Sequence, residues 1–356
     1  MYLLEMLYWK SKTSEDVASS LRTVEREGAG YPNIGQRAEV PPADGFAFFS
    51  VGENFIDVQG AWQEDKRGLV TFLFLGVMVV LQYYFLIGAV VPGARSLASG
   101  FGALGNPLRA DGYIFISIII LMWAFANIMF FRICWRWIRL EIFVQRRIIA
   151  RFNRVTRQVY INRPDYAGGL VTLPWDATIA EASGGNAASP AGGTLAMVWP
   201  ASYSGSGFDD YCLIGGTLPD RASAEALWEY IRLFMEEGPN AVPRPARLRS
   251  TFPWPWDSVR STLSFLVPSW RTGDKGLLLT FALILSPLLL LHSICHWLSL
   301  LLCWPTWWPR TIRRAGLPGA PVPKLTTADD YGPEMAAKLR ASALKVVDNN
   351  SGSSGP

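Results

Sequence analysis

Two histidines and two cysteines that lie close together near the end of the chain are the residues whose types would suit a metal ion. His292 and His296 are four residues apart, so a helix would place both on one face, with Cys295 and Cys303 nearby. A zinc site needs three or four converging ligands, and the surrounding apolar stretch contains no carboxylate. We therefore interpret the histidines as polar residues at a contact between helices or near the membrane interface, and we predict no metal and no cofactor.

Nucleophilic and acid–base chemistry have equally few candidates. Residues 204–207 superficially resemble a nucleophile turn, but the Gly-x-Ser-x-Gly spacing is missing. No histidine lies outside the last apolar stretch to serve as a base. The paired acids at 209–210 and 236–237 fall in an expected loop and at an expected helix end, where carboxylates are usually solvated. The sequence predicts a protein that is not an enzyme.

Three long apolar stretches, at residues 69–92, 113–131 and 277–303, set the class of the protein. Each reaches the roughly 18 to 20 residues that a helix needs to cross a hydrocarbon core about 30 Å thick. Lipid offers no partners for backbone polar groups, so such stretches form helices. The first stretch begins too far along the chain to be a secretory signal peptide. The sequence therefore predicts an integral membrane protein.

Arginines beside the second stretch indicate its orientation. Eight of them lie between residues 132 and 157 against the single acid Glu141, whereas the loop 91–112 carries two. The positive-inside rule then predicts a protein of the bacterial inner membrane. It places the N-terminus and the chain after residue 132 on the cytoplasmic side, and the loop 91–112 on the outer side. Their position beside a span favours a topological role over nucleic-acid binding. Five are candidate contacts for anionic lipid or a protein partner: Arg146, Arg147, Arg151, Arg154 and Arg157.

The third stretch admits two topologies. It is longer than one crossing needs, and Ser286 and Pro287 interrupt it near its middle. Basic residues flank both ends, so a single kinked crossing would place the C-terminus outside, against the charge rule. A re-entrant hairpin that turns at Ser286 and Pro287 would keep both ends inside, provided that protein covers its backbone. The charges favour the hairpin without deciding the question.

The chain outside the spans predicts a small antiparallel β-domain, so the fold class is an α+β membrane protein. Seven strands are expected, at 45–51, 55–58, 148–152, 158–162, 170–174, 195–199 and 211–215. One helix follows at 223–236, with Ser223 as its cap. This order is typical of a small barrel plugged by a C-terminal helix, as in pleckstrin-homology-like folds. The first two spans would be inserted in its sheet as a transmembrane hairpin.

Aromatic residues near the third stretch indicate a membrane interface. Residues 254–270 place apolar side chains on one helical face, as an interfacial helix does, although an ordinary surface helix fits equally well. The tract 304–309 is rich in tryptophan and proline and predicts an aromatic belt. The expected membrane-interface anchors are Trp254, Trp256, Trp270, Trp304, Trp307 and Trp308.

The whole chain then divides into six parts along its length. These are a polar N-terminal region at 1–44 with a short amphipathic helix at 11–27, strands at 45–60 that join the soluble domain, a transmembrane hairpin at 69–134, a cytoplasmic β-rich domain with a closing helix at 147–240, an interfacial helix and third membrane segment at 254–308, and a polar, flexible tail at 309–356.

Several segments, taken in order, resemble an uncharacterised family of proteobacterial inner-membrane proteins. They are residues 151–160, 173–176, 228–239 and 288–308, and the resemblance spans about residues 45–310. It implies a gene near type VI secretion toxin genes, and hence an immunity or accessory partner of a toxin. The family supplies no catalytic residues. The chain departs from the pattern at 309–315, which is basic rather than acidic.

Three functions remain open. The outside loop has about twenty residues, too few for a standard interface of roughly 800 Å² per partner. An immunity protein of this kind would therefore meet a secreted toxin within the membrane or at its cytoplasmic face, and a pore-forming toxin fits best. The alternatives are a membrane-anchored adaptor whose β-domain binds anionic lipid or a cytoplasmic protein, and a homo-oligomeric channel subunit.

Overall fold

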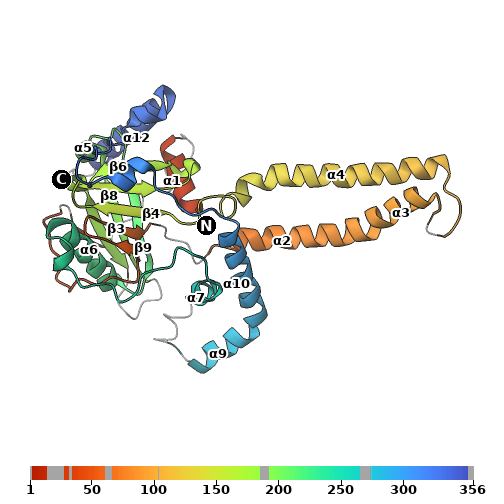
Figure 1. Ribbon diagram of the computed structural model, residues 1–356, viewed down its shortest axis with the longest axis horizontal. Helices are drawn as coiled ribbons and strands as arrows, with labels where there is room; N and C mark the ends of the chain where they lie inside the picture. Colours follow the sequence, from red (N-terminus) through yellow and green to blue (C-terminus); the bar gives the residue numbers. More distant parts are fainter. Residues whose placement is uncertain are drawn as a thin grey trace.

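A long helical hairpin projects from a β-rich body (Figure 1). The computed structural model describes residues 2–13, 28–31, 34–60, 66–102, 104–184, 192–264, 273 and 275–351. Within these residues two helices are long and apolar enough to cross a membrane, Leu69–Ser99 and Ala110–Ile138. The first comprises α2 (Leu69–Leu81), the π-helix η2 (Gln82–Val90) and α3 (Val91–Ser99), and the second is α4 (Ala110–Ile138). The two predicted spans of the hairpin are thus present as helices of the required length.

The body contains two antiparallel sheets, and all seven predicted strands are confirmed. One sheet has the order β2 (Phe48–Val51), β3 (Phe55–Gln59), β4 (Ile149–Asn153), β5 (Gln158–Asn162) and β6 (Leu170–Pro174). The other has the order β1 (Gly28–Tyr31), β7 (Ile179–Gly184), β8 (Gly193–Trp199) and β9 (Asp210–Leu218). The strands β1 and β7 were not predicted.

The hairpin is inserted between two neighbouring strands of one sheet, as the sequence predicted. Strand β3 precedes the first span and β4 follows the second span. The two strands nevertheless pair in continuous register, from Phe55 opposite Asn153 to Gln59 opposite Ile149. Backbone hydrogen bonds of the sheet therefore close the base of the hairpin.

The body is filled by large side chains between the sheets and the helix α6 (Arg221–Glu236). Trp175 and Trp228 lie in this core with ring centroids 5.8 Å apart. The cap of α6 differs from the prediction: Asp220 accepts a hydrogen bond from the Ser223 backbone N–H at 2.8 Å. Ser223 lies within the first turn and also donates its hydroxyl to Asp220, so the carboxylate, the stronger acceptor, is the cap.

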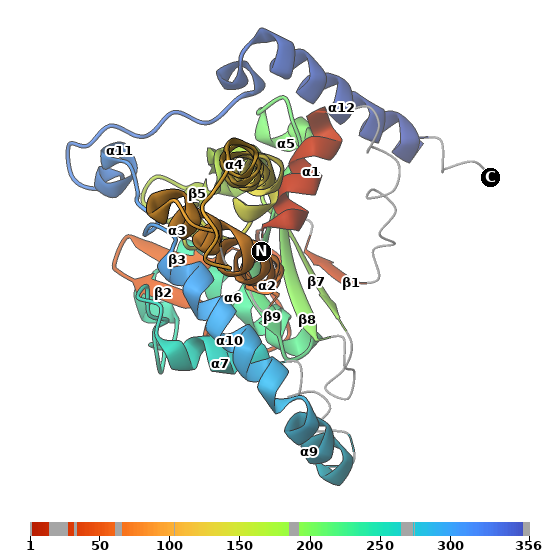
Figure 2. The same cartoon turned by 90° about the vertical axis from the view of Figure 1, so that its right-hand side faces the viewer.

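The third apolar stretch is broken where the sequence predicted, but it does not fold back on itself. The helices α9 (Lys275–Ile284) and α10 (Ser286–Leu301) are bent by 68° at the break. Helix α10 packs against α7 (Pro255–Leu263) and against α2. In both views α10 runs across the direction of the hairpin rather than along it (Figures 1 and 2).

The C-terminal region was expected to be a flexible tail, and the structure corrects this expectation. Ile312, Ala328 and Leu339 are almost fully buried against the body. Helix α11 (Arg310–Arg314) packs near β4 and β5, and α12 (Pro333–Ser351) packs beside the N-terminal helix α1 (Leu3–Thr13). Apolar residues recur along α12 at helical spacing and give it a face to bury. Most of the helix expected at 11–27 lies outside the described residues.

Shorter helical segments complete the described part of the chain. They are η3 (Asp165–Ala167), η4 (Trp175–Ala177), α5 (Ala201–Ser204), η5 (Pro239–Ala241) and η6 (Ala328–Tyr331).

Candidate functional site

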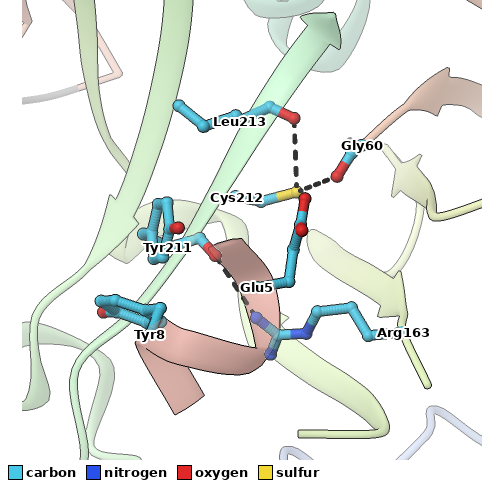
Figure 3. A pocket seen from close by; sticks show the side chains of 7 residues that line it. All are labelled: Glu5, Tyr8, Gly60, Arg163, Tyr211, Cys212 and Leu213. Atoms are coloured by element: carbon cyan, nitrogen blue, oxygen red, sulfur yellow. Dashed lines mark hydrogen bonds between the residues drawn. The ribbon is translucent and has the colours of Figure 1, made fainter. Parts of the chain in front are cut away.

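The body holds a small cavity between α1 and β9, too small for a metabolite (Figure 3). Its volume of about 10 Å³ is room for about one water molecule. Glu5 of α1 points toward Cys212, and Arg163 donates to the Tyr211 carbonyl at 3.4 Å. Burial raises the pKa of Cys212 to about 12, so the thiol stays protonated and a poor nucleophile.

The two histidines lie at a contact between helices. His296 is buried and its Nδ1 lies 2.9 Å from the Ser258 hydroxyl, while His292 Nδ1 lies 3.0 Å from the Thr262 hydroxyl. Both hydroxyls belong to α7, so the histidines join α10 to α7, as predicted. The part of the chain that the structure describes contains no group of three or more potential metal-ligating side chains.

The serines and paired acids singled out in the sequence take part in local structure. The Ser204 and Ser206 hydroxyls bond to each other at 2.8 Å, in a buried turn. Asp209 accepts from the Ala201 backbone N–H at 2.9 Å. Asp210 forms a buried ion pair with Arg163. These contacts hold the loop before β9.

Among the five candidate arginines, two are paired with acids of the body. Arg151 forms two 2.7 Å bonds with Asp57, and its guanidinium lies between the rings of Phe55 and Trp308. Arg157 pairs with Asp176 and, at 3.0 Å, with Glu236. Their charges are therefore already offset within the chain.

The other three arginines lie at separate places. Arg146 donates to the Leu300 and Cys303 carbonyls at 3.1 and 3.0 Å, at the C-terminal end of α10. Arg147 is buried over the ring of Phe49. Arg154 lies against Gly238. The five arginines therefore do not form one exposed basic surface.

The expected tryptophan anchors are mostly exposed. Trp254 and Trp256 stack with ring centroids 4.7 Å apart at the start of α7, and Trp304 and Trp307 are exposed after α10. Trp308 differs, because it is 9 % exposed and covers Arg151 in a small core of its own. Trp270 lies outside the described residues.

Arg67 joins several segments at the base of the hairpin. Its side chain is 1 % exposed and donates to the Glu141 carbonyl at 2.5 Å and the Arg146 carbonyl at 2.6 Å. It also donates to the Tyr2 and Ser299 hydroxyls at 3.2 Å each. One guanidinium thus ties the N-terminus, the end of α4 and the end of α10 to the start of the first span.

Within the hairpin, a polar cluster joins the two spans. Gln82 donates to the Asn127 amide oxygen at 2.6 Å and accepts from the Trp123 indole at 3.2 Å. Asn127 in turn donates to the Trp123 carbonyl at 2.8 Å. Amides bonded across helices are typical of contacts within lipid, where water cannot compete.

The next two residues, Tyr83 and Tyr84, form what we call the tyrosine pair. They lie in the π-helix η2, and their side chains are 61 % and 68 % exposed. Their rings meet edge to face at 5.4 Å. Neither hydroxyl has a hydrogen-bond partner among the described residues, so both would face the lipid chains.

The tyrosine pair lies well inside the apolar band. The apolar band of the first helix begins at Leu69, the first residue of α2. Arg95 marks the other end of the band. At 1.5 Å per residue, the pair lies about 22 Å from the start of α2 and about 17 Å from Arg95, well away from both ends of the band. Tyrosine is normally concentrated at the edges of such a band.

Sequence reasoning overlooked both Arg67 and the tyrosine pair. Gln82 and Asn127 are the only side-chain amides in the two apolar runs, so the polar cluster left a visible signal. Arg67 left none, because its partners are spread from residue 2 to residue 303.

Comparison with known proteins adds one match. The model of a family of unknown function, DUF6708, matches residues 210–317, less than a third of the chain. This segment runs from β9 through α6, α7, α9 and α10 to α11. No curated protein and no solved structure matches the chain.

Proposed function

We propose that this protein is a non-catalytic inner-membrane protein that acts as the immunity or accessory partner of a type VI secretion toxin, by binding it within the membrane. The toxin's own membrane-inserted helix is the expected partner, as in a pore-forming toxin. The tyrosine pair is the observation that carries this proposal.

A hydroxyl left without a partner in hydrocarbon costs on the order of a few kcal/mol. Two adjacent tyrosines on the outer face of a two-helix hairpin therefore favour a state in which another helix covers them. That helix would accept their hydrogen bonds through exposed carbonyl or side-chain oxygens. Contact inside the membrane also agrees with the short loop between the spans, which offers little surface to a partner outside.

The cellular setting rests on two sequence observations. The arginines after α4 favour a cytoplasmic body by the positive-inside rule. The resemblance to inner-membrane proteins encoded near type VI toxins favours a toxin as the partner. We also propose that the two sheets and α6 form a pleckstrin-homology-like barrel, since β3 and β9 meet where Cys212 lies 3.5 Å from the Gly60 carbonyl.

The adaptor hypothesis has less support. It needs the candidate arginines to be available to anionic headgroups, but Arg151 and Arg157 are paired with Asp57, Asp176 and Glu236. Breaking such pairs to bind lipid would cost part of the binding free energy.

The test is co-expression of the adjacent toxin gene with variants of this chain, scored by cell survival and membrane potential. We expect the wild-type chain to preserve both. The double variant Tyr83→Phe, Tyr84→Phe keeps the rings but removes both hydroxyls. At about 1 kcal/mol per interhelical hydrogen bond, toxin binding should weaken roughly tenfold or more, and protection should fall.

The matched control is Tyr203→Phe, which removes an exposed hydroxyl from the body. It should protect as well as the wild-type chain. If the wild-type chain gives no protection although it is correctly inserted, the immunity function is wrong. If the double variant protects fully, the function stands but the tyrosine pair is not its contact. The hairpin could instead pair with a second copy of this chain. In that case a crosslinker attached at residue 83 or 84 will join two copies whether or not the toxin is present.

A further inference from the structure

We infer that α9 and α10 lie flat in the bilayer surface on the side of the body, with the outer face of α10 against lipid, so that the residues the structure describes cross the membrane only twice. This goes beyond the toxin-binding function and does not depend on it. The occupant of the α10 surface is lipid itself rather than a protein partner.

Both ends of the segment are bound to the same body. Before it, the Arg249 backbone N–H donates to the Phe48 carbonyl of β2 at 2.8 Å. After it, Trp304 donates to the Val144 carbonyl at 3.2 Å and accepts from the Arg146 backbone N–H at 2.8 Å. A single crossing would leave these two ends on opposite sides of a core about 30 Å thick, so it is excluded by the fold.

The direction of α10 also opposes a crossing. The hairpin defines the direction through the membrane, and α10 runs across that direction in both views (Figures 1 and 2). Its 16 residues span about 24 Å, and the 68° bend separates them from α9. Neither helix alone is long enough to cross the core.

The two faces of α10 are arranged the opposite way from those of a soluble helix. Its polar residues Ser293, His296 and Ser299 are buried against the protein. Its exposed face carries Leu288, Leu291, Ile294 and Leu301. No Asp, Glu, Lys or Arg occurs from 276 to 309. An apolar outer face of this kind is unstable in water and is typical of a surface-bound membrane helix.

The position of this face is continuous with the membrane spans. The α10 backbone at His296 approaches Gly68 so closely that a Cβ there would lie 2.6 Å from the His296 nitrogen. Gly68 directly precedes α2, so α10 meets the hairpin where the first span enters the bilayer. Exposed aromatic residues occur at the same base, namely Trp135, Trp137, Phe143, Trp304 and Trp307. They match the aromatic belt of a membrane interface.

Site-directed spin labelling of the full chain in phosphatidylethanolamine–phosphatidylglycerol vesicles tests this placement. Labels are attached at Leu291→Cys and Ile294→Cys in a Cys134→Ser background, because the other three native cysteines are buried. Oxygen reports lipid exposure and a water-soluble nickel chelate reports water exposure. The reference positions are Val155→Cys, exposed on the body, and Ile118→Cys, exposed within α4.

We expect both α10 labels to have an oxygen-to-nickel ratio above that of Val155→Cys and below that of Ile118→Cys, as shallow lipid contact gives. A ratio as low as that of Val155→Cys would mean that water covers α10 and would overturn the inference. Low access of both oxygen and the nickel chelate would mean that protein covers the outer face of α10, and this result would also overturn the inference. A ratio equal to that of Ile118→Cys would mean that α10 lies as deep in the hydrocarbon as a residue of a membrane-spanning helix, which is equally incompatible.

Discussion

Buried charges in the body are arranged to stabilise the fold. Asp210 is fully buried, bonds Arg163 at 3.0 and 2.6 Å, and lies 3.5 Å from Lys12. Burial alone would raise the pKa of Asp210, but the two cations outweigh it and hold the pKa below 3.8. Lys12 comes from α1 and Arg163 follows β5, so one carboxylate joins the N-terminal helix to both sheets.

This arrangement predicts a dependence of stability on acid. Because the pKa of Asp210 is lower in the folded state, its ionised carboxylate stabilises the protein at pH values above the unfolded-state pKa of about 3.9. This stabilisation is lost as the pH falls through the folded-state pKa. At pH 7, Asp210→Asn should lower the free energy of unfolding by about 3 to 5 kcal/mol, since it leaves buried cations unpaired. The difference in Tm between wild type and variant should narrow below about pH 4.

The control for this prediction is Asp329→Asn, which removes an exposed acid paired with Arg340. Its effect should stay below about 1 kcal/mol at every pH. A gap between wild type and Asp210→Asn that is unchanged from pH 7 to pH 3 would contradict the role of the ionised carboxylate.

At the scale of elements, the contact of α2 with α10 depends on a glycine. Gly68 has φ +98°, which favours glycine, and a Cβ would meet the backbone of His296. Gly68→Ala should therefore separate the two helices and destabilise the protein by at least about 1 to 3 kcal/mol. Thermal unfolding in detergent measures this loss as a fall in Tm.

Gly76→Ala is the matched control, because Gly76 lies within α2 and its added Cβ would meet nothing within 4 Å. Alanine is favoured over glycine within a helix by about 0.5 to 1 kcal/mol, so Tm should stay constant or rise slightly. Equal effects of the two changes would mean that α10 does not rest against the start of α2.

The elements that the sequence predicted are those with a strong local cause. Lipid imposes a length on spans, and alternating apolar residues mark most strands. Strand β7 was missed because its sequence is rich in small residues. Its Ala180 and Ala182 side chains are fully buried, and α6 packs against this strand, where larger side chains would not fit. The junction at Arg67 was unpredictable because residues distant in the chain form it.

At the scale of the whole molecule, the C-terminal region completes the body. Leu339 of α12 is 1 % exposed and belongs to the main core, together with Ala328. Leu339→Ala should cost about 2 to 5 kcal/mol of stability. Leu317→Ala, at an exposed position in the same region, should change stability by no more than about 0.5 kcal/mol. Similar Tm values for the two variants would restore the view of this region as a flexible tail.

The insertion of the hairpin between β3 and β4 also orders events during synthesis. Strand β3 leaves the ribosome first, and its neighbour β4 is made only after both spans. Until then β3 has an unpaired edge, which is prone to aggregation. The edge is covered only after both helices of the hairpin have been made and the chain has come back to the body. Completion of the body therefore waits for the whole hairpin, and a chain that stops before β4 keeps an open sheet edge.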